Sequence, residues 1–101
     1  MEMKISFKNM DPSDALKVFT NEKSERLAKY FQGRIIVNWT FSREHERRVA
    51  HCHLIGNNMD YFGQAEADDM HAAVDIALER IETQLRRHKE VVTNHLHRRQ
   101  A

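Results

Sequence analysis

The chain has 101 residues, enough for one domain whose hydrophobic core needs no disulfide or metal. Hydrophobic residues make up 41% and charged residues 31% of it, with a net charge of +1, which excludes the composition of a disordered chain. With one cysteine, no apolar run near the ~20 residues of a membrane span and no signal-peptide pattern after Met1, the sequence predicts a cytoplasmic protein without membrane contact.

The first two predicted elements are a strand and a helix. Apolar and polar residues alternate from Met3 to Phe7, as they do in a half-buried strand. Asp11-Pro12-Ser13 offers cap residues and a first-turn proline, so it predicts the start of a helix that ends near Phe31, before Gly33. The inner face expected for this helix consists of Leu16, Phe19, Leu27 and Tyr30, with Lys23 as its polar member.

Three strands are expected next, over residues 35–42, 49–55 and 59–66. In the first of these, Trp39 shares one face with three other apolar side chains. In the second, His51 and His53 lie on the face opposite Cys52, which we expect to be buried. The segment Gly56-Asn57-Asn58 is typical of a hairpin turn.

A long helix is predicted to close the chain. Asp68 or Asp69 caps it, and an apolar stripe continues to Val92. A helix of this length spans roughly 36 Å and an eight-residue strand roughly 26 Å, so the helix should overhang the sheet from Arg86 onward. We expect one domain over residues 1–101, with 93–101 as a basic tail for which disorder is one option.

The element order β-α-β-β-β-α predicts an α+β fold. The first two strands should pair in parallel through a right-handed crossover, and the last three should form an antiparallel meander. Two helices then cover one face of a four-stranded sheet and leave the other face open.

Neither a metal site nor an active site is predicted. His51 and His53 could be two metal ligands, but no third ligand stands at a recognisable spacing, so we expect them to face solvent. The three glycines are scattered, which excludes a glycine-rich phosphate loop, and no nucleophile–base grouping is suggested. We therefore predict no enzyme activity, no cofactor and no small-molecule substrate.

Basic residues concentrate on the two helices. Lys23, Arg26 and Lys29 recur every three residues, and Arg80 and Arg87 lie two turns apart. Arg86 and Lys89 broaden the second group, so the outer surfaces of both helices could form one basic platform that neutralises phosphates. The alternative is a solvated surface with local ion pairs such as Glu22–Arg26 and Glu82–Arg86.

Four segments resemble the hibernation-promoting factor and ribosome-associated inhibitor (protein Y) family. They are Met3-Lys4-Ile5-Ser6 with Asn9-Met10-Asp11, the run from Ala15-Leu16 to Lys29-Tyr30, residues 65–75, and Gln84-Leu85-Arg86-Arg87-His88-Lys89. The most specific of them is the Asp-Met-x-x-Ala-[Ile/Val]-[Asp/Asn] run that opens the last helix. The resemblance covers about residues 3–90.

The resemblance implies a fold like a double-stranded-RNA-binding domain. It also implies a stress- and stationary-phase inhibitor of translation that docks on small-subunit (16S-type) rRNA where mRNA and tRNAs sit. Position by position, the family's RNA-binding residues fall on Lys23, Arg26, Lys29, Arg80, Arg86, Arg87 and Lys89. His71 and Thr83 depart from the family's usual Tyr and frequent Arg. The short chain resembles the type that supports inactive ribosome dimers.

Two other functions stay open from the sequence. One is a generic structured-RNA-binding module with no role on the ribosome, which would recognise RNA by shape and backbone. The other is a protein-interaction module that uses the open sheet face with His51, His53 and Thr40.

Overall fold

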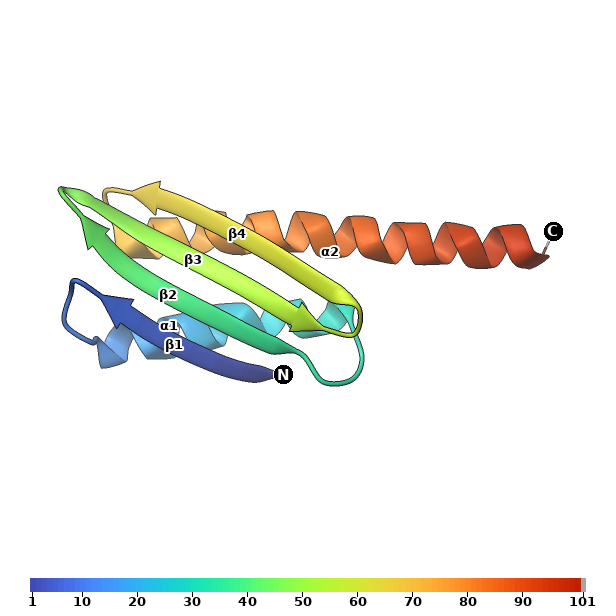
Figure 1. Ribbon diagram of the computed structural model, residues 1–101, viewed down its shortest axis with the longest axis horizontal. Helices are drawn as coiled ribbons and strands as arrows, with labels where there is room; N and C mark the ends of the chain where they lie inside the picture. Colours follow the sequence, from blue (N-terminus) through green and yellow to red (C-terminus); the bar gives the residue numbers. More distant parts are fainter. Residues whose placement is uncertain (101) are drawn as a thin grey trace.

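The computed structural model describes the backbone of residues 1–100 and the side chains of residues 1–89. The strands and helices follow one another in the order β-α-β-β-β-α that the sequence predicts, with a short 3₁₀-helix after the first α-helix (Figure 1). In order they are β1 (Glu2–Lys8), α1 (Asp14–Ser24), the 3₁₀-helix η1 (Glu25–Tyr30), β2 (Ile36–Glu44), β3 (Arg47–Gly56), β4 (Met59–Ala67) and α2 (Met70–Gln100).

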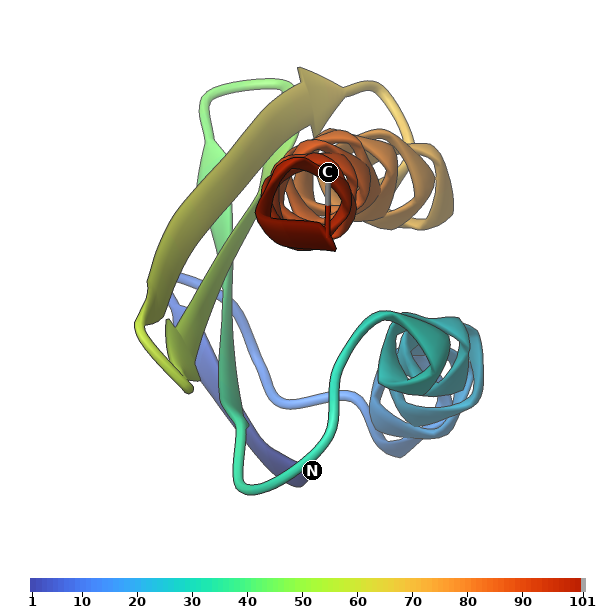
Figure 2. The same ribbon diagram turned by 90° about the vertical axis from the view of Figure 1, so that its right-hand side faces the viewer.

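The sheet has the strand order β1-β2-β3-β4, with β1 parallel to β2 and the other pairs antiparallel. Figure 2 shows α1, η1 and α2 on the same side of this sheet, while the other side is open in the described part of the chain. The α+β fold predicted from the element order is therefore confirmed.

The core fills the space between the sheet and the helices. Trp39 is 1% exposed and pairs in register with Ile5 on one side and Cys52 on the other, so the predicted inward face of β2 is confirmed. Cys52 is fully buried as expected, and this burial raises the pKa of its thiol to about 12. From α2, the apolar stripe from Met70 to Leu85 completes the core.

Local sequence signals set the element boundaries. The side chain of Ser13 accepts a hydrogen bond from the Leu16 amide, and Asp69 caps α2 by accepting one from the Ala72 amide. Asn57 and Asn58 both have positive φ and form the two-residue loop between β3 and β4, which is the geometry of a type I′ hairpin.

Gly63 allows α2 to lie directly against β4. A Cβ atom at this position would collide with the backbone oxygen of Ala77 in α2. The absence of a side chain thus brings the helix backbone close to the strand.

The first helical segment differs from the prediction in type and in face. The expected end near Phe31 is confirmed, but the expectation of a single α-helix is wrong, because α1 ends at Ser24 and a 3₁₀-helix continues to Tyr30. The buried positions are Leu16, Thr20, Ser24 and Leu27, whereas Lys23 is exposed and Phe19 only half-buried. Ser24 is inward because its hydroxyl accepts a hydrogen bond of 3.1 Å from the Trp39 indole.

The last helix is longer than predicted. It continues past Val92 to Gln100, since residues 93–100 contain neither glycine nor proline to end it. Its 31 residues correspond to about 46 Å, and Figure 1 shows it extending beyond the β3–β4 turn, which confirms the overhang. No helix among the described residues has both the length and the apolar character needed to cross a membrane.

Candidate nucleic-acid interface

Two of the predicted basic residues extend from α1 and η1 into solvent. The Lys23 ammonium lies 5.5 Å from the centre of the Phe19 ring, and the Lys29 ammonium lies 5.2 Å from that of Tyr30. Both lysines are exposed. An ammonium above an aromatic ring keeps its charge and is partly oriented by the ring, so both can meet a phosphate.

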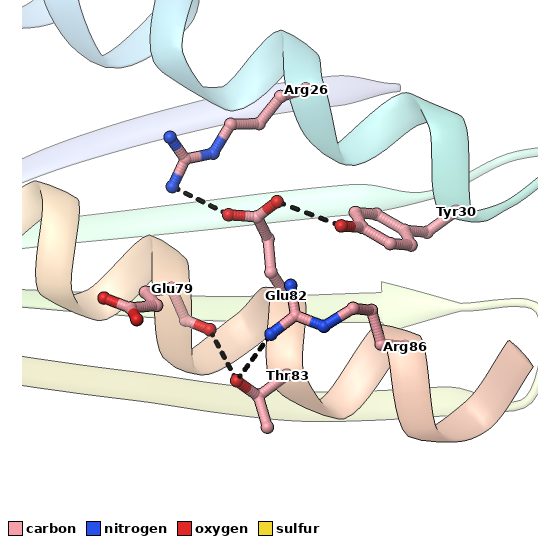
Figure 3. A network of polar contacts seen from close by, with 6 residues as sticks. All are labelled: Arg26, Tyr30, Glu79, Glu82, Thr83 and Arg86. Carbon is pink, nitrogen blue, oxygen red and sulfur yellow. Dashed lines mark hydrogen bonds and ion pairs between the residues drawn. The ribbon is translucent and has the colours of Figure 1, made fainter. Parts of the chain in front are cut away.

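Arg26, the third basic residue of this segment, is bound within the fold. Its Nη2 atom lies 2.7 Å from Oε1 of Glu82 in α2, whose side chain is 10% exposed (Figure 3). The Tyr30 hydroxyl donates a hydrogen bond of 3.1 Å to the other oxygen of the same carboxylate. Of the local pairs considered from the sequence, Glu82–Arg86 does not form in the described structure, because Glu82 points across to η1 instead.

The basic residues of α2 point in different directions. Arg86 donates to the Thr83 hydroxyl, which itself donates to the backbone oxygen of Glu79 (Figure 3). Arg80 donates to the backbone oxygen of Gln64 on the outer edge of β4. Arg80 therefore covers an unpaired strand edge as well as carrying charge.

Arg87 and Lys89 lie on opposite flanks of α2, because two residues correspond to about 200° of helical rotation. Lys89 lines a hollow together with Lys29 of η1, whereas Arg87 lines a shallow depression with Tyr61 and Gln84 on the β4 side. The seven predicted residues are therefore not one continuous platform. Lys29 and Lys89 lie around the hollow between η1 and α2, whereas Arg80 and Arg87 face β4.

The open sheet face carries an aromatic cluster. His53 stacks on Phe62 with ring centroids 3.9 Å apart, and His51 stacks on the same ring at 5.3 Å. Phe62 is 52% exposed, and Nε2 of His53 lies 2.6 Å from the Asp60 carboxylate. Partial burial, followed by the neighbouring charges of His53 and Lys8, lowers the pKa of His51.

This cluster has no third metal ligand in the described structure. Among the residues with described side chains, no three His, Cys, Asp or Glu groups converge as a metal site requires. The two imidazoles instead stack on the ring of Phe62, which stays exposed on the open sheet face.

Sequence reasoning missed one residue of these surfaces and the contacts of two others. Glu82 and Tyr30 link the two helical segments, and Phe62 forms the centre of the aromatic cluster. Strand alternation could have placed Phe62 beside the histidines, because it pairs directly with His53. No pattern in the sequence indicates that Glu82 faces Arg26.

The fold is that of a small α+β domain in which helices with exposed basic residues cover one face of a four-stranded sheet. Residues 3–93 match the family described as sigma 54 modulation protein / S30EA ribosomal protein, and the chain belongs to this family.

Three comparisons illustrate the similarity. The ribosome hibernation promoting factor of Azotobacter vinelandii is 30% identical over 90 residues, which cover 89% of this chain and 84% of that protein. The Protein Y N-terminal domain of Thermus thermophilus has a TM-score of 0.81 at 26% identity and covers 86% of this chain and 98% of its own. A ribosomal subunit interface protein from Coxiella burnetii has a TM-score of 0.78 at 26% identity, over 89% and 99%.

Proposed function

We propose that this protein is a ribosome hibernation factor that binds small-subunit rRNA at the mRNA and tRNA channel and inhibits translation in the cytoplasm. The observation that carries the proposal is that Lys29 and Lys89 line the same hollow from two different helices, in a chain that belongs to the S30EA family. The names of two similar proteins, a hibernation promoting factor and a subunit interface protein, support the same role.

Charge supplies the physical basis for rRNA binding. Within the described residues, Lys23, Lys29, Arg87 and Lys89 make no ion pair with an acidic side chain. Such groups release counterions when they meet phosphates, which is the dominant source of sequence-independent RNA affinity. Lys29 and Lys89 lie on the η1 side of α2 and Arg87 lies on the β4 side, so an RNA backbone can be met on both flanks of this helix.

The proposal includes the support of inactive ribosome dimers. A protein that occupies the channel between the subunits stops translation on a single ribosome, and dimerisation needs a further contact. The relative from Azotobacter vinelandii carries hibernation promotion in its name, which supports the hibernation role that such dimers would serve.

One alternative has an observation of its own. The exposed ring of Phe62, with His51 and His53 stacked against it, could be a contact for a protein partner on the open sheet face. That interface would be largely insensitive to salt, because stacked rings and apolar contacts are only weakly screened.

Binding to purified small subunits tests these functions. We expect the protein to cosediment with small subunits in preference to an equal mass of duplex RNA, and to inhibit translation in a purified system. Equal binding to both RNAs would favour a generic structured-RNA module. Binding that persists unchanged at high salt would favour the sheet-face interaction.

A further inference from the structure

A hollow opens between η1 and α2, beside the β3–β4 turn. It has a volume of about 530 Å³, within the 300–1,000 Å³ that is typical of sites for small organic groups. The residues that matter for its chemistry are Lys29, Tyr30, Phe31, Asn57, His88 and Lys89. A site of this size is larger than a single phosphate contact requires.

The lining combines three kinds of group that recognise a nucleotide. Lys29 and Lys89 supply positive charge from opposite walls, and none of the lining residues in the described structure is acidic. Tyr30 and Phe31 supply aromatic rings on which a base can stack. The Asn57 side-chain amide donates to the backbone oxygen of Gln32, which leaves its carbonyl oxygen as an acceptor for a base edge.

The aromatic wall is held in place before any ligand arrives. The Tyr30 hydroxyl is bonded to Glu82 in α2, and the same carboxylate is paired with Arg26 (Figure 3). These two contacts fix the distance between η1 and α2, which form the two walls. A site whose walls are already positioned loses less freedom when it binds.

We propose that this hollow accepts one unpaired nucleotide of the bound RNA, with its base against Tyr30 and Phe31 and its phosphate between Lys29 and Lys89. The inference rests on the proposed function, since it takes RNA as the partner. It adds that the RNA is unpaired and unstacked at this point, which backbone contacts alone do not require.

The first test uses small subunits and two single variants. Because stacking involves no counterion release, Phe31→Leu should weaken binding by about 5- to 150-fold while the slope of log affinity against log salt stays the same. Lys29→Ala should weaken binding and also make that slope shallower by about one. Lys23→Ala, on α1 outside the hollow, is the matched control for charge alone. Unchanged affinity of Phe31→Leu would overturn the proposal, provided that its circular dichroism matches the parent.

The second test compares two RNA duplexes of equal length, one fully paired and one with a single bulged nucleotide. The parent should prefer the bulged duplex, and both Phe31→Leu and Lys29→Ala should reduce that preference, whereas Lys23→Ala should weaken both duplexes equally. Equal affinity of the parent for the two duplexes, or a preference that survives both hollow variants, would overturn the site.

Competition with AMP separates RNA from a free nucleotide. If millimolar AMP abolishes the preference and binds by itself with the same sensitivity to the variants, the ligand is a free nucleotide and the commitment to RNA is wrong. A parent that does not bind small subunits would instead contradict the proposed function.

Discussion

The guanidinium of Arg26 and the carboxylate of Glu82 form an ion pair of 2.7 Å that joins η1 to α2. Glu82 is a charged residue with only 10% of its side chain exposed, and it also accepts a hydrogen bond from the Tyr30 hydroxyl. One arginine of the candidate interface thus has a structural role as well. The same contacts set the spacing of the two helical segments that carry the basic residues.

Removal of the Glu82 carboxylate should destabilise the fold. We expect Glu82→Ala to lower the free energy of unfolding by about 1–3 kcal/mol, because the half-buried Tyr30 hydroxyl loses its acceptor and the exposed Arg26 loses its ion pair. Urea unfolding followed by circular dichroism measures this loss. The control is Glu79→Ala, one turn earlier on the exposed side of α2, which should change stability by no more than about 0.5 kcal/mol. Equal stability of the two variants would show that the ion pair contributes nothing.

The buried bond between Trp39 and Ser24 should be important for stability. Trp39→Ala should cost about 3–5 kcal/mol, because it empties a fully enclosed position of the core. Ser24→Ala leaves the indole N–H without its acceptor and should cost about 1–3 kcal/mol. Thermal and urea unfolding of both variants provide the measurement. If Trp39→Ala melts like the parent, the indole does not support the core in solution.

Salt should weaken the binding to small subunits. With six or seven phosphate contacts, the slope of log affinity against log salt should lie between about −4 and −6. We expect the shallow end of this range, because Arg26 is already paired with Glu82 and its charge is partly neutralised. The slope can be measured by filter binding or cosedimentation at salt concentrations from about 50 to about 300 mM. A slope near zero would contradict a phosphate-based interface.

The C-terminal basic group should be needed for ribosome binding and dispensable for folding. Changing Arg86, Arg87 and Lys89 together to Ala should leave the melting curve nearly unchanged, because all three are exposed. The same variant should relieve the inhibition of translation and make the salt slope shallower by up to about 3. The control is the double change His51→Ala with His53→Ala on the open sheet face. If only the control loses ribosome binding, the interface lies on the open sheet face and not on the helices.

His51 should make stability depend on pH. Its pKa is lowered in the folded protein by partial burial and then by His53 and Lys8, so the unfolded chain binds the proton more readily. Stability should therefore fall as the pH decreases from above 7 through the unfolded value of 6.5, and level off below the folded pKa. Urea unfolding of the parent and of His51→Gln at several pH values separates this contribution, because His53 is retained in both. If the free energy of unfolding changes with pH in the same way in both proteins, His51 does not contribute to the pH dependence.

The order of the elements could be predicted from the sequence because each depends on a short-range pattern. Alternation placed Trp39 inward and His51 outward, and the asparagine pair after Gly56 indicated the hairpin. The stripe of α2 identified the helix and its overhang, although the C-terminal boundary was wrong. These signals involve residues only a few positions apart, so they do not require knowledge of which element lies opposite.

The basic residues of the candidate site could also be named from the sequence, but their arrangement could not. Spacing along a helix gives the angle between Arg87 and Lys89 about its axis, yet it does not say that β4 lies on one flank and η1 on the other. Only the tertiary structure divides these charges into two groups.

By itself, the sequence determined the α+β fold, the inward faces of the first three strands and the set of exposed cations. The tertiary structure decided the change to a 3₁₀-helix after Ser24, the pairing of Arg26 with Glu82, and the hollow between η1 and α2. The physical reason is that each of these depends on a contact between distant segments. The Trp39 indole donates to Ser24 of α1, and Glu82 of α2 meets Arg26 and Tyr30 of η1. Such contacts form only when separate elements pack together, so no local period in the chain encodes them.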